Sequence, residues 1–219
     1  MKNILCFGDS NTWGYDVTTF DPALGSGQRM TFDVRWPGRV QNILGSDYRI
    51  IEDALNARTV MNQDPYFPHR LGIASLEVAL DAHAPLDLVI IKLGVNELKH
   101  MFNLTAGMIA FGVEKLVMAA KNRYYNYPEP QILVIAPHPV SPNIYNNLFG
   151  FSFGPLAYEK SCEFGALYKD LATRHGCGFI DCADLNFSLN TLDGLHYSHE
   201  DHAKLADVVA EKVREMLEH

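Results

Sequence analysis

Five short apolar segments alternate along the chain with longer segments that have helical periodicity. The apolar segments are continuous rather than alternating, a pattern typical of parallel strands that are buried on both faces. They lie at residues 4–7, 48–51, 86–91, 131–136 and 178–180. Helical spacing of apolar residues occurs at 36–45, 71–83, 107–123, 154–176 and from Ser198 onward, where Ser198 and Asp201 can form a capping box. This alternation predicts a three-layer α/β/α sandwich built around a mostly parallel five-stranded sheet.

The length and the charge of the chain restrict its organisation and its partners. Its 219 residues contain no proline- or serine-rich linker, which predicts one domain over residues 1–219. The 18 basic and 26 acidic side chains give a formal charge of -8, which argues against nucleic acid or an anionic membrane as a partner. The continuous apolar runs of the chain, such as 88–91, are far too short to span a bilayer.

The N-terminal segment and the cysteines indicate a cytoplasmic protein. No charged segment or small-residue cleavage site precedes the first predicted strand, so we expect no signal peptide. The cysteines show neither a CxxC pair nor a regular spacing, and we interpret them as reduced thiols. They are Cys6, Cys162, Cys177 and Cys182.

The first predicted strand breaks at Gly8-Asp9-Ser10 and so places a serine hydroxyl at its carboxyl end. In open parallel sheets this edge is where ligands bind. A serine becomes a nucleophile only when a base takes its proton and a third group orients that base. Asp193 and His196, three residues apart and ahead of the last predicted helix, are the best candidates for these two groups. We interpret Asp9 as a turn residue that bonds to local backbone.

Two further groups follow predicted strands and are expected on the same edge of the sheet. Asn96 follows the third strand, and its side-chain amide donates hydrogen bonds without titrating. Ala57 follows the second strand and offers its backbone N–H. Preorganised donors of this kind stabilise the negative charge that develops on an attacked carbonyl oxygen. Each feature is weak alone, but together they predict a hydrolytic site around Ser10.

Three short motifs, in their order along the chain, resemble those of the SGNH (GDS-type) hydrolases. They are Gly8-Asp9-Ser10, Gly94-Val95-Asn96-Glu97 and Asp193-Gly194-Leu195-His196. The stretches GDSNTWG, LDLVIIKLGVNE and DGLHYS are similar in particular to the branch of aryl esterases and acyltransferases. The resemblance implies the flavodoxin-like fold of that family, no cofactor, no metal and a homo-oligomeric assembly, with residues 137–154 as a candidate contact.

The resemblance also implies a role for each motif residue. It makes Ser10 the nucleophile, His196 the general base and Asp193 the residue that orients this base. The oxyanion hole would consist of the backbone N–H groups of Ser10 and Ala57 and the side chain of Asn96.

Two residues depart from the family pattern. The family usually has glycine where this chain has Ala57, whose N–H remains a donor provided that its backbone φ is negative. Glu97 stands where aspartate is usual. Its additional methylene is expected to change the hydrogen bond that this side chain makes, and with it the positioning of Asn96.

Two segments, 11–35 and 137–154, are too long for simple connectors, and we expect both to form walls of a substrate pocket. Asn11, Trp13 and Tyr15 follow Ser10 closely and are predicted to contact the substrate. The alternatives are core packing for the two aromatic residues, and a packed surface loop or a subunit contact for 137–154.

The sequence therefore predicts a serine esterase that hydrolyses small carboxylic esters with short acyl groups, with acyl transfer to an alcohol left open. A carbohydrate O-acetyl esterase and an acyl-CoA thioesterase would use the same residues. Metal-dependent phosphoester hydrolysis is disfavoured because no histidine stands beside Asn96. The histidines His196, His199 and His202 also disfavour a metal site, since the outer two would point away from one another on a helix. A binding module without activity is the remaining alternative.

Overall fold

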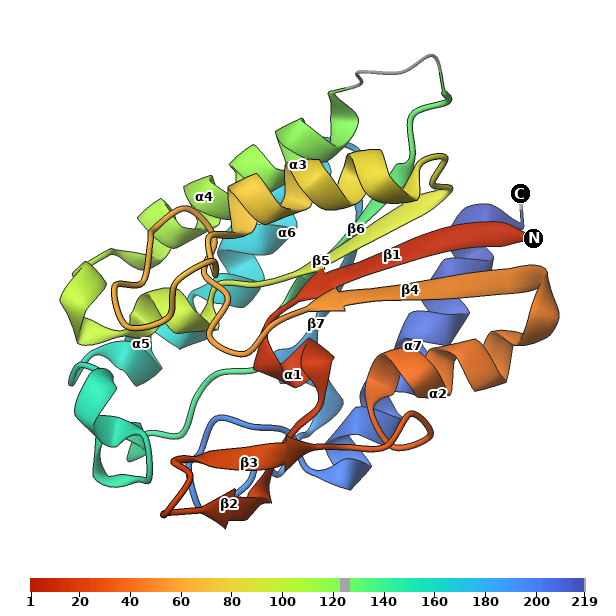
Figure 1. Ribbon diagram of the computed structural model, residues 1–219. Coiled ribbons are helices and arrows are strands. Elements are labelled where there is room, and N and C mark those ends of the chain that lie inside the picture. Colours follow the sequence, from red (N-terminus) through yellow and green to blue (C-terminus); the bar gives the residue numbers. More distant parts are fainter. Residues whose placement is uncertain (123–126, 219) are drawn as a thin grey trace.

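The structure is a computed structural model that describes residues 1–122 and 127–218. A sheet of five parallel strands forms its centre (Figure 1). In spatial order the strands are β4 (Tyr48–Ala54), β1 (Lys2–Gly8), β5 (Leu88–Lys92), β6 (Gln131–Ala136) and β7 (Gly178–Asp181). Each predicted apolar segment overlaps one of these strands, and the predicted architecture is confirmed. Gly8 pairs with both Ala54 and Lys92, so the carboxyl ends of β4, β1 and β5 lie side by side.

Helices cover both faces of the sheet (Figure 1). One face carries α2 (Trp36–Leu44) and α7 (His199–Leu217), and the other carries α3 (Gly72–His83), α4 (Ala106–Lys121) and α6 (Phe164–Arg174). The predicted capping box opens α7, because Ser198 Oγ accepts the Asp201 N–H and the Asp201 carboxylate accepts the Ser198 N–H, each at 3.1 Å. Within the described parts of the chain, no helix has the length and apolarity needed to cross a bilayer.

Several helix boundaries differ from the prediction. The helix predicted over 154–176 is two helices, α5 (Ala157–Cys162) and α6. At the break, Glu163 donates its N–H to the carbonyl of Lys160, three residues back, which interrupts the α-helical ladder. The helix predicted over 107–123 is α4, and the end of that prediction lies outside the described residues. Short 3-10 helices complete the chain: η1 (Gly45–Asp47), η2 (Val95–Leu98), η3 (His100–Phe102), η4 (Ile144–Asn146), η5 (Gly150–Ser152) and η6 (Cys182–Leu185).

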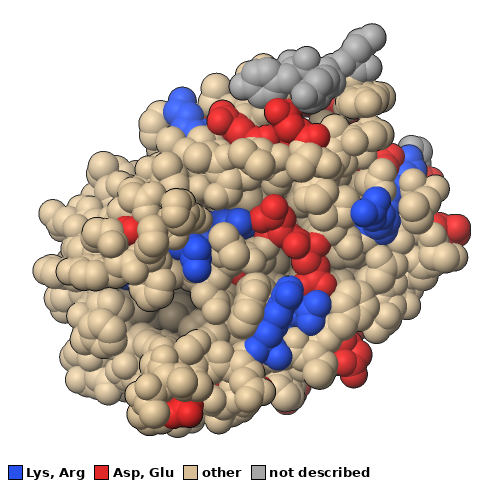
Figure 2. All heavy atoms as spheres, viewed as in Figure 1, with Lys and Arg blue, Asp and Glu red and all other residues tan. Residues whose placement is uncertain are grey.

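The segment 11–35, predicted as a long loop, contains regular structure. It holds α1 (Ser10–Trp13), β2 (Tyr15–Asp21) and β3 (Ser26–Arg29), and the two strands pair antiparallel as a hairpin. Only Tyr15 and Val17 are buried in this hairpin, so its apolar pattern is too short to mark two strands in the sequence. The hairpin lies beyond the carboxyl ends of the main strands, next to a hollow in the surface (Figures 1 and 2).

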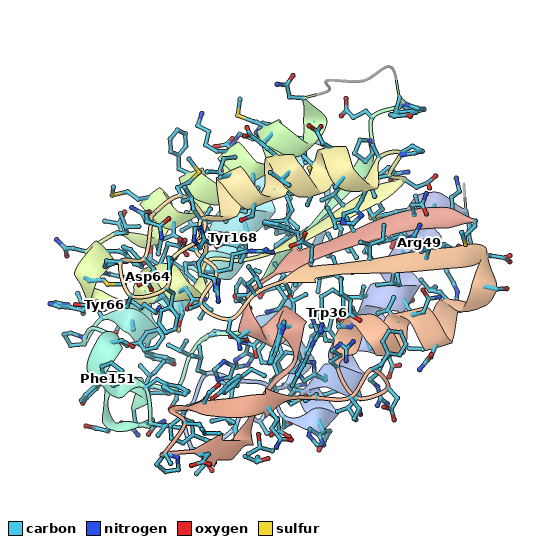
Figure 3. The ribbon with its side chains drawn as sticks, viewed as in Figure 1. Trp36, Arg49, Asp64, Tyr66, Phe151 and Tyr168 are labelled. Carbon is cyan, nitrogen blue, oxygen red and sulfur yellow. The ribbon has the colours of Figure 1, made fainter. Side chains whose placement is uncertain are left out.

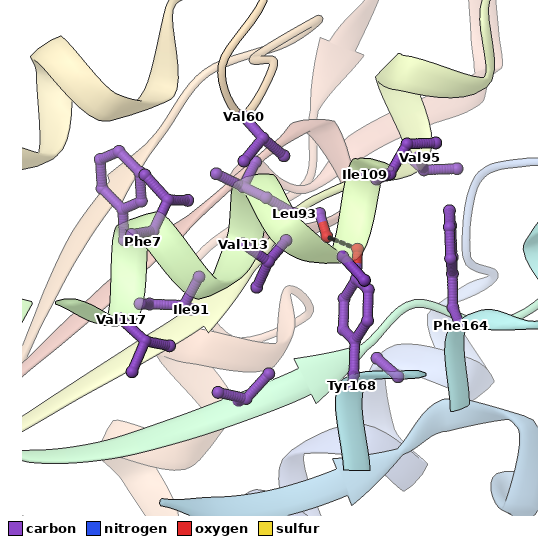
Figure 4. Close-up of a cluster of buried hydrophobic side chains, with 14 of the residues drawn as sticks. Phe7, Val60, Ile91, Leu93, Val95, Ile109, Val113, Val117, Phe164 and Tyr168 are labelled. Carbon is purple, nitrogen blue, oxygen red and sulfur yellow. Dashed lines mark hydrogen bonds between the residues drawn. The ribbon is translucent and has the colours of Figure 1, made fainter. Parts of the chain in front are cut away.

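Alternate residues of each strand contribute to two separate cores. In β1, Ile4 and Cys6 belong to the core shared with α2 and α7, where Trp36 is fully buried (Figure 3). Leu5 and Phe7 belong to the core shared with α3, α4 and α6 (Figure 4). Each fully buried side chain of this kind contributes about 1.5–3 kcal/mol. Burial on both faces explains why the strands appear in the sequence as continuous apolar runs.

Candidate active site

The junction between β1 and α1 places Ser10 at the carboxyl edge of the sheet. Asp9 caps α1, since its Oδ1 accepts the N–H of Asn11 at 3.0 Å, and the predicted turn role of Asp9 is confirmed. A Cβ on Gly8 would lie 2.1 Å from the hydroxyl oxygen of Thr12, so glycine is required for a turn this close. Ser10 is therefore the first residue of a helix that starts directly beyond the strand.

Three side chains far apart in the sequence form a continuous hydrogen-bonded chain. The Oγ of Ser10 lies 2.8 Å from Nε2 of His196, and Nδ1 of His196 lies 2.5 Å from Oδ2 of Asp193. The other carboxylate oxygen of Asp193 accepts the backbone N–H groups of Leu195 and His196 at 2.9 and 3.0 Å. All three side chains are buried. The structure thus brings together the serine, histidine and aspartate that the sequence predicts as partners.

The environment of Asp193 fixes the tautomer of His196. Burial by itself would raise the pKa of the Asp193 carboxyl, but the hydrogen bond and charge of His196 and the two backbone N–H groups outweigh burial and lower this pKa. An ionised Asp193 accepts a hydrogen bond, so Nδ1 of His196 carries the proton of the neutral ring. Nε2 is then the unprotonated nitrogen, and it faces the hydroxyl of Ser10.

Asn11 binds the loop that carries His196. Its Nδ2 donates to the carbonyl of Leu195 at 3.2 Å, and its Oδ1 accepts the N–H of Tyr197 at 2.9 Å. The side chain is only 2% exposed. Both polar atoms of Asn11 bind the backbone on either side of His196 and hold this loop against α1, and a substrate contact of Asn11 stays a prediction.

Aromatic side chains surround His196 on the side of the two long segments. The ring of Tyr15 lies 4.6 Å from the imidazole, and Phe149 lies 6.0 Å from it in an edge-to-face arrangement. Phe20 packs against Phe149 at 5.7 Å. Phe20 and Phe149 come from the segments 11–35 and 137–154 that were predicted as pocket walls, but nothing local distinguishes them from their aromatic neighbours. We call Tyr15, Phe20 and Phe149 the aromatic cluster.

Trp13 lies partly exposed and packs on the hairpin. Its ring is covered by the guanidinium of Arg29 at 5.2 Å, and its carbonyl accepts the Nε–H of Arg29 at 2.7 Å. These contacts connect α1 to β3. Tyr15 contacts the imidazole of His196 directly, whereas the contacts of Trp13 are with Arg29.

Asn96 lies in η2, at the carboxyl end of β5. Its Nδ2 donates to the carbonyl of Arg58 at 3.0 Å, which orients the amide and leaves its second N–H as a further donor. Gly94 precedes it with φ +126, and a Cβ there would lie 2.1 Å from the hydroxyl of Tyr168. That hydroxyl donates to the carbonyl of Leu93 at 3.0 Å (Figure 4). The turn that positions Asn96 thus requires glycine.

The 55–60 segment, directly after β4, lies next to the same edge. The N–H of Leu55 donates to the carbonyl of Gly8 at 3.3 Å, and the N–H of Arg58 donates back to Leu55 at 3.1 Å. Ala57 sits in this turn with φ +62, a left-handed conformation that costs a residue with a side chain about 1–2 kcal/mol. The negative φ that was set as a condition for Ala57 to remain a donor is therefore not met, but a left-handed residue keeps its backbone N–H, so this group is still able to donate.

Arg58 holds this strained turn, and sequence reasoning missed it. Its guanidinium donates to the carboxylate of Asp53 at 2.7 Å and to the carbonyls of Asp53 and Gly8 at 2.6 and 3.3 Å. It also covers the ring of Phe7 at 4.1 Å and is 2% exposed. A buried arginine with these contacts ties the 55–60 segment to the end of β1, close to Ser10. Its signal in the sequence is a single basic residue, which carries no information about burial.

Comparison with known proteins gives the family of the chain. Residues 6–204 match the model of the GDSL-like lipase/acylhydrolase family. The chain belongs to this family. A search of curated proteins found no match. The family match and the site motifs identify this GDSL-family chain as one of the SGNH (GDS-type) hydrolases that its sequence resembles.

Solved structures similar to this GDSL-family chain include three esterases. Est24, a carbohydrate acetylesterase from Sinorhizobium meliloti, is 37% identical with a TM-score of 0.90, over 99% of this chain and 100% of that one. The aryl esterase of M. smegmatis is 35% identical with a TM-score of 0.88, over 99% and 100%. A carbohydrate acetylesterase family member from Sinorhizobium meliloti is 34% identical with a TM-score of 0.88, over 100% of both chains. The family and these neighbours show an esterase-type hydrolase.

The three closely spaced histidines of this GDSL-family hydrolase have different partners. His196 joins Ser10 and Asp193, the exposed His199 lies 3.3 Å from the carboxylate of Asp16, and Nδ1 of the buried His202 accepts the N–H of Trp36 at 3.1 Å. Across residues 1–122 and 127–218, no three histidine, cysteine or acidic side chains gather as a metal site would require. The histidine spacing therefore does not build a metal site in the described part of the chain.

Proposed function

We propose that this hydrolase cleaves small carboxylic esters with Ser10 as its nucleophile. The supporting observation is the chain of contacts from Ser10 Oγ through His196 to Asp193, at 2.8 and 2.5 Å. His196 takes the hydroxyl proton as Oγ attacks the ester carbonyl carbon, and then gives this proton to the leaving alcohol oxygen. The acyl group remains on Ser10. His196 next activates a water, or an acceptor alcohol, whose oxygen takes the acyl group and frees the serine.

The oxyanion formed in each step is assigned to donors at the same edge. We propose the side-chain amide of Asn96 and the backbone N–H groups of Ser10 and Ala57. This proposal is supported by the hydrogen bond from Asn96 to Arg58, which brings the amide beside the Ala57 turn. A preorganised donor of this kind stabilises the transition state by roughly 3–4 kcal/mol.

The substrate class that the site supports best is a short acyl ester of a small uncharged alcohol. The aromatic cluster beside His196 offers an apolar surface, which suits an aryl or other apolar alcohol. The carbohydrate O-acetyl ester is the second candidate, because two of the similar structures are described as carbohydrate acetylesterases. A formal charge of -8 disfavours the polyanionic acyl-CoA thioesters and nucleic acid.

Covalent labelling tests the nucleophile. A fluorophosphonate probe is expected to label the wild-type protein stoichiometrically at Ser10 and to leave Ser10→Ala unlabelled. Ester hydrolysis should be lost with the label. Activity retained by a folded Ser10→Ala variant, or a binding protein that neither labels nor hydrolyses any ester, would refute the proposal.

A substrate panel separates the candidates. We expect p-nitrophenyl acetate or acetylated xylose to be hydrolysed in preference to acetyl-CoA, and an added alcohol reveals acyl transfer as a new ester product.

A chelator tests the alternative of metal-dependent chemistry. EDTA should leave the rate of ester hydrolysis unchanged. Activity that disappears with EDTA and returns with Zn²⁺ or Mn²⁺ would favour metal-dependent chemistry and contradict the serine mechanism.

We also propose that the protein is a homo-oligomer. Apolar side chains on the outer face of α4 are exposed, with Met108 and Phe111 each at 56%, and Phe151 in the 137–154 segment is 89% exposed (Figure 3). Exposed large apolar side chains mark interaction sites in many proteins where they form a contiguous patch. Light scattering at micromolar concentration measures the assembly, and a monomer would contradict this part of the proposal.

A further inference from the structure

Glu97 connects the two loops that carry the proposed oxyanion-hole donors. It follows Asn96 in η2, and its Oε1 accepts the backbone N–H of Val60 in the 55–60 segment. Asn96 itself donates to the carbonyl of Arg58 in the same segment at 3.0 Å. Two consecutive residues of η2 therefore bind two nearby backbone groups of the segment that contains Ala57. We call this pair of hydrogen bonds the loop clamp.

The glutamate of the clamp is enclosed by protein. Its side chain is 2% exposed, and its second carboxylate oxygen, Oε2, has no hydrogen-bond partner among the described residues. A buried polar atom without a partner costs free energy, so a role in packing alone does not explain a carboxyl at this position. An apolar side chain of similar length would fill the same space without that cost.

The charged and titratable groups around Glu97 come from several elements. Asp9 approaches from the β1–α1 junction, and the hydroxyl of Tyr168 approaches from α6. Lys99, two residues along the chain, interacts with Glu97 and is paired with Asp64 at 2.7 Å. Arg58 interacts with Asp9 and is engaged by Asp53.

We propose that Glu97 is a positioning residue whose carboxyl clamps η2 to the 55–60 segment and so sets the distance between the Asn96 amide and the Ala57 N–H. The proposal rests on the assignment of these two groups as oxyanion donors. A glutamate side chain reaches one methylene further than the aspartate usual in the family, and in this chain it is this longer side chain that binds Val60. Misplacement of catalytic groups by about 1 Å can cost about 10²-fold in rate.

The protonation state of Glu97 gives the clamp a pH dependence. Burial raises the pKa of the Glu97 carboxyl to about 8; the Val60 hydrogen bond lowers this pKa, Asp9 raises it and Lys99 lowers it. At pH 7 the carboxyl is therefore mostly neutral. Ionisation, which is half complete near pH 8, leaves a poorly solvated negative charge near Asp9, and this desolvation cost exceeds what the Val60 hydrogen bond recovers, which favours hydration and opening of the clamp. The rate constant kcat is then expected to decline as pH rises through about 8, with little change in KM.

Three variants test the clamp with p-nitrophenyl acetate as substrate. Glu97→Gln keeps an acceptor for Val60 but cannot ionise, so kcat at pH 7 should stay within about twofold of wild type and should not decline up to pH 9. Glu97→Met has similar length but no comparable acceptor, and we expect kcat to fall about 10- to 100-fold at nearly unchanged KM. Leu116→Ala truncates a buried residue of α4 and serves as the control for a general loss of stability.

The outcomes separate the clamp from the proposed mechanism. A folded Glu97→Met variant with wild-type kcat, or the same alkaline decline in Glu97→Gln as in wild type, would overturn the clamp. If Glu97→Met does not fold, the pH profile of Glu97→Gln still decides. If only the clamp is wrong, the fluorophosphonate probe still labels Ser10 and Ser10→Ala is still inactive. If the serine mechanism is wrong, neither result is obtained.

Discussion

Replacing Asp193 by asparagine should reverse the direction of its hydrogen bond with His196 in the proposed triad while preserving the shape of the site. Oδ1 of Asp193 accepts two backbone N–H groups at 2.9 and 3.0 Å, and Oδ2 faces Nδ1 of His196 at 2.5 Å. The two backbone donors fix the carbonyl oxygen of an asparagine at the Oδ1 position, so its NH₂ group must face Nδ1. Nδ1 then has to accept, and the single proton of the neutral imidazole moves to Nε2.

An imidazole protonated at Nε2 cannot take the proton of Ser10. In serine proteases the same change of tautomer lowers kcat by about 10⁴, which corresponds to about 5.5 kcal/mol of transition-state stabilisation. We expect kcat to decrease by about 10³- to 10⁴-fold in Asp193→Asn. KM should change little, because Asp193 is buried behind His196 and only 1% exposed.

The assay is steady-state hydrolysis of p-nitrophenyl acetate, with thermal unfolding to confirm that the variant is folded. Asp16→Asn is a matched control, because Asp16 also faces a histidine, the exposed His199, at 3.3 Å but lies outside the triad. We expect this control to keep its activity. A folded Asp193→Asn variant with kcat within tenfold of wild type would refute the assigned role of Asp193.

Three further predictions concern single residues. Asn96→Ala should lower kcat by about 10²–10³ with little change in KM, and equal rates for the folded variant and wild type would remove Asn96 from the oxyanion hole. Ala57→Gly relieves the left-handed strain at φ +62 and should raise the free energy of unfolding by up to about 1 kcal/mol in urea denaturation; a clear loss of stability would show that the turn is not strained. Burial lowers the pKa of His202 to about 3, below its unfolded value, so its stabilising contribution is present above about pH 6.5 and is lost as pH falls. Between pH 7 and pH 5, urea denaturation should show that the free energy of unfolding of wild type falls by about 2 kcal/mol relative to that of His202→Asn, and the same pH dependence in both proteins would contradict this account.

Much of the fold could be predicted because a strand that is buried on both faces has a recognisable run of apolar residues in the sequence. A strand covered by helices on both sides needs apolar residues at consecutive positions, and the segments 131–136 and 178–180 show this pattern without knowledge of their neighbours. The β2–β3 hairpin has no such run of apolar residues, because most of its residues are exposed or only partly buried. The break between α5 and α6 was also missed, since Glu163 is compatible with a continuous helix.

The residues of the candidate site also divide into those that the sequence could predict and those that it could not. Ser10, Asn96, Asp193 and His196 could be proposed because each follows an element whose end is visible in the sequence, and their motifs resemble those of a known family. The contacts of Arg58, Phe20 and Phe149 could not be proposed in advance, because a single basic or aromatic residue is equally compatible with a surface and with a core.

The sequence by itself determined the class of fold, the edge of the sheet at which chemistry could occur and the side chains that we propose react there. Only the tertiary structure decided that Asn11 holds the His196 loop, that Ala57 is left-handed and that Glu97 binds the 55–60 segment. Local patterns report which residues are buried, since burial selects for residue type. The partner that a buried polar group binds depends on contacts between distant segments, such as residues 11 and 197, and these arise only when the sheet has assembled.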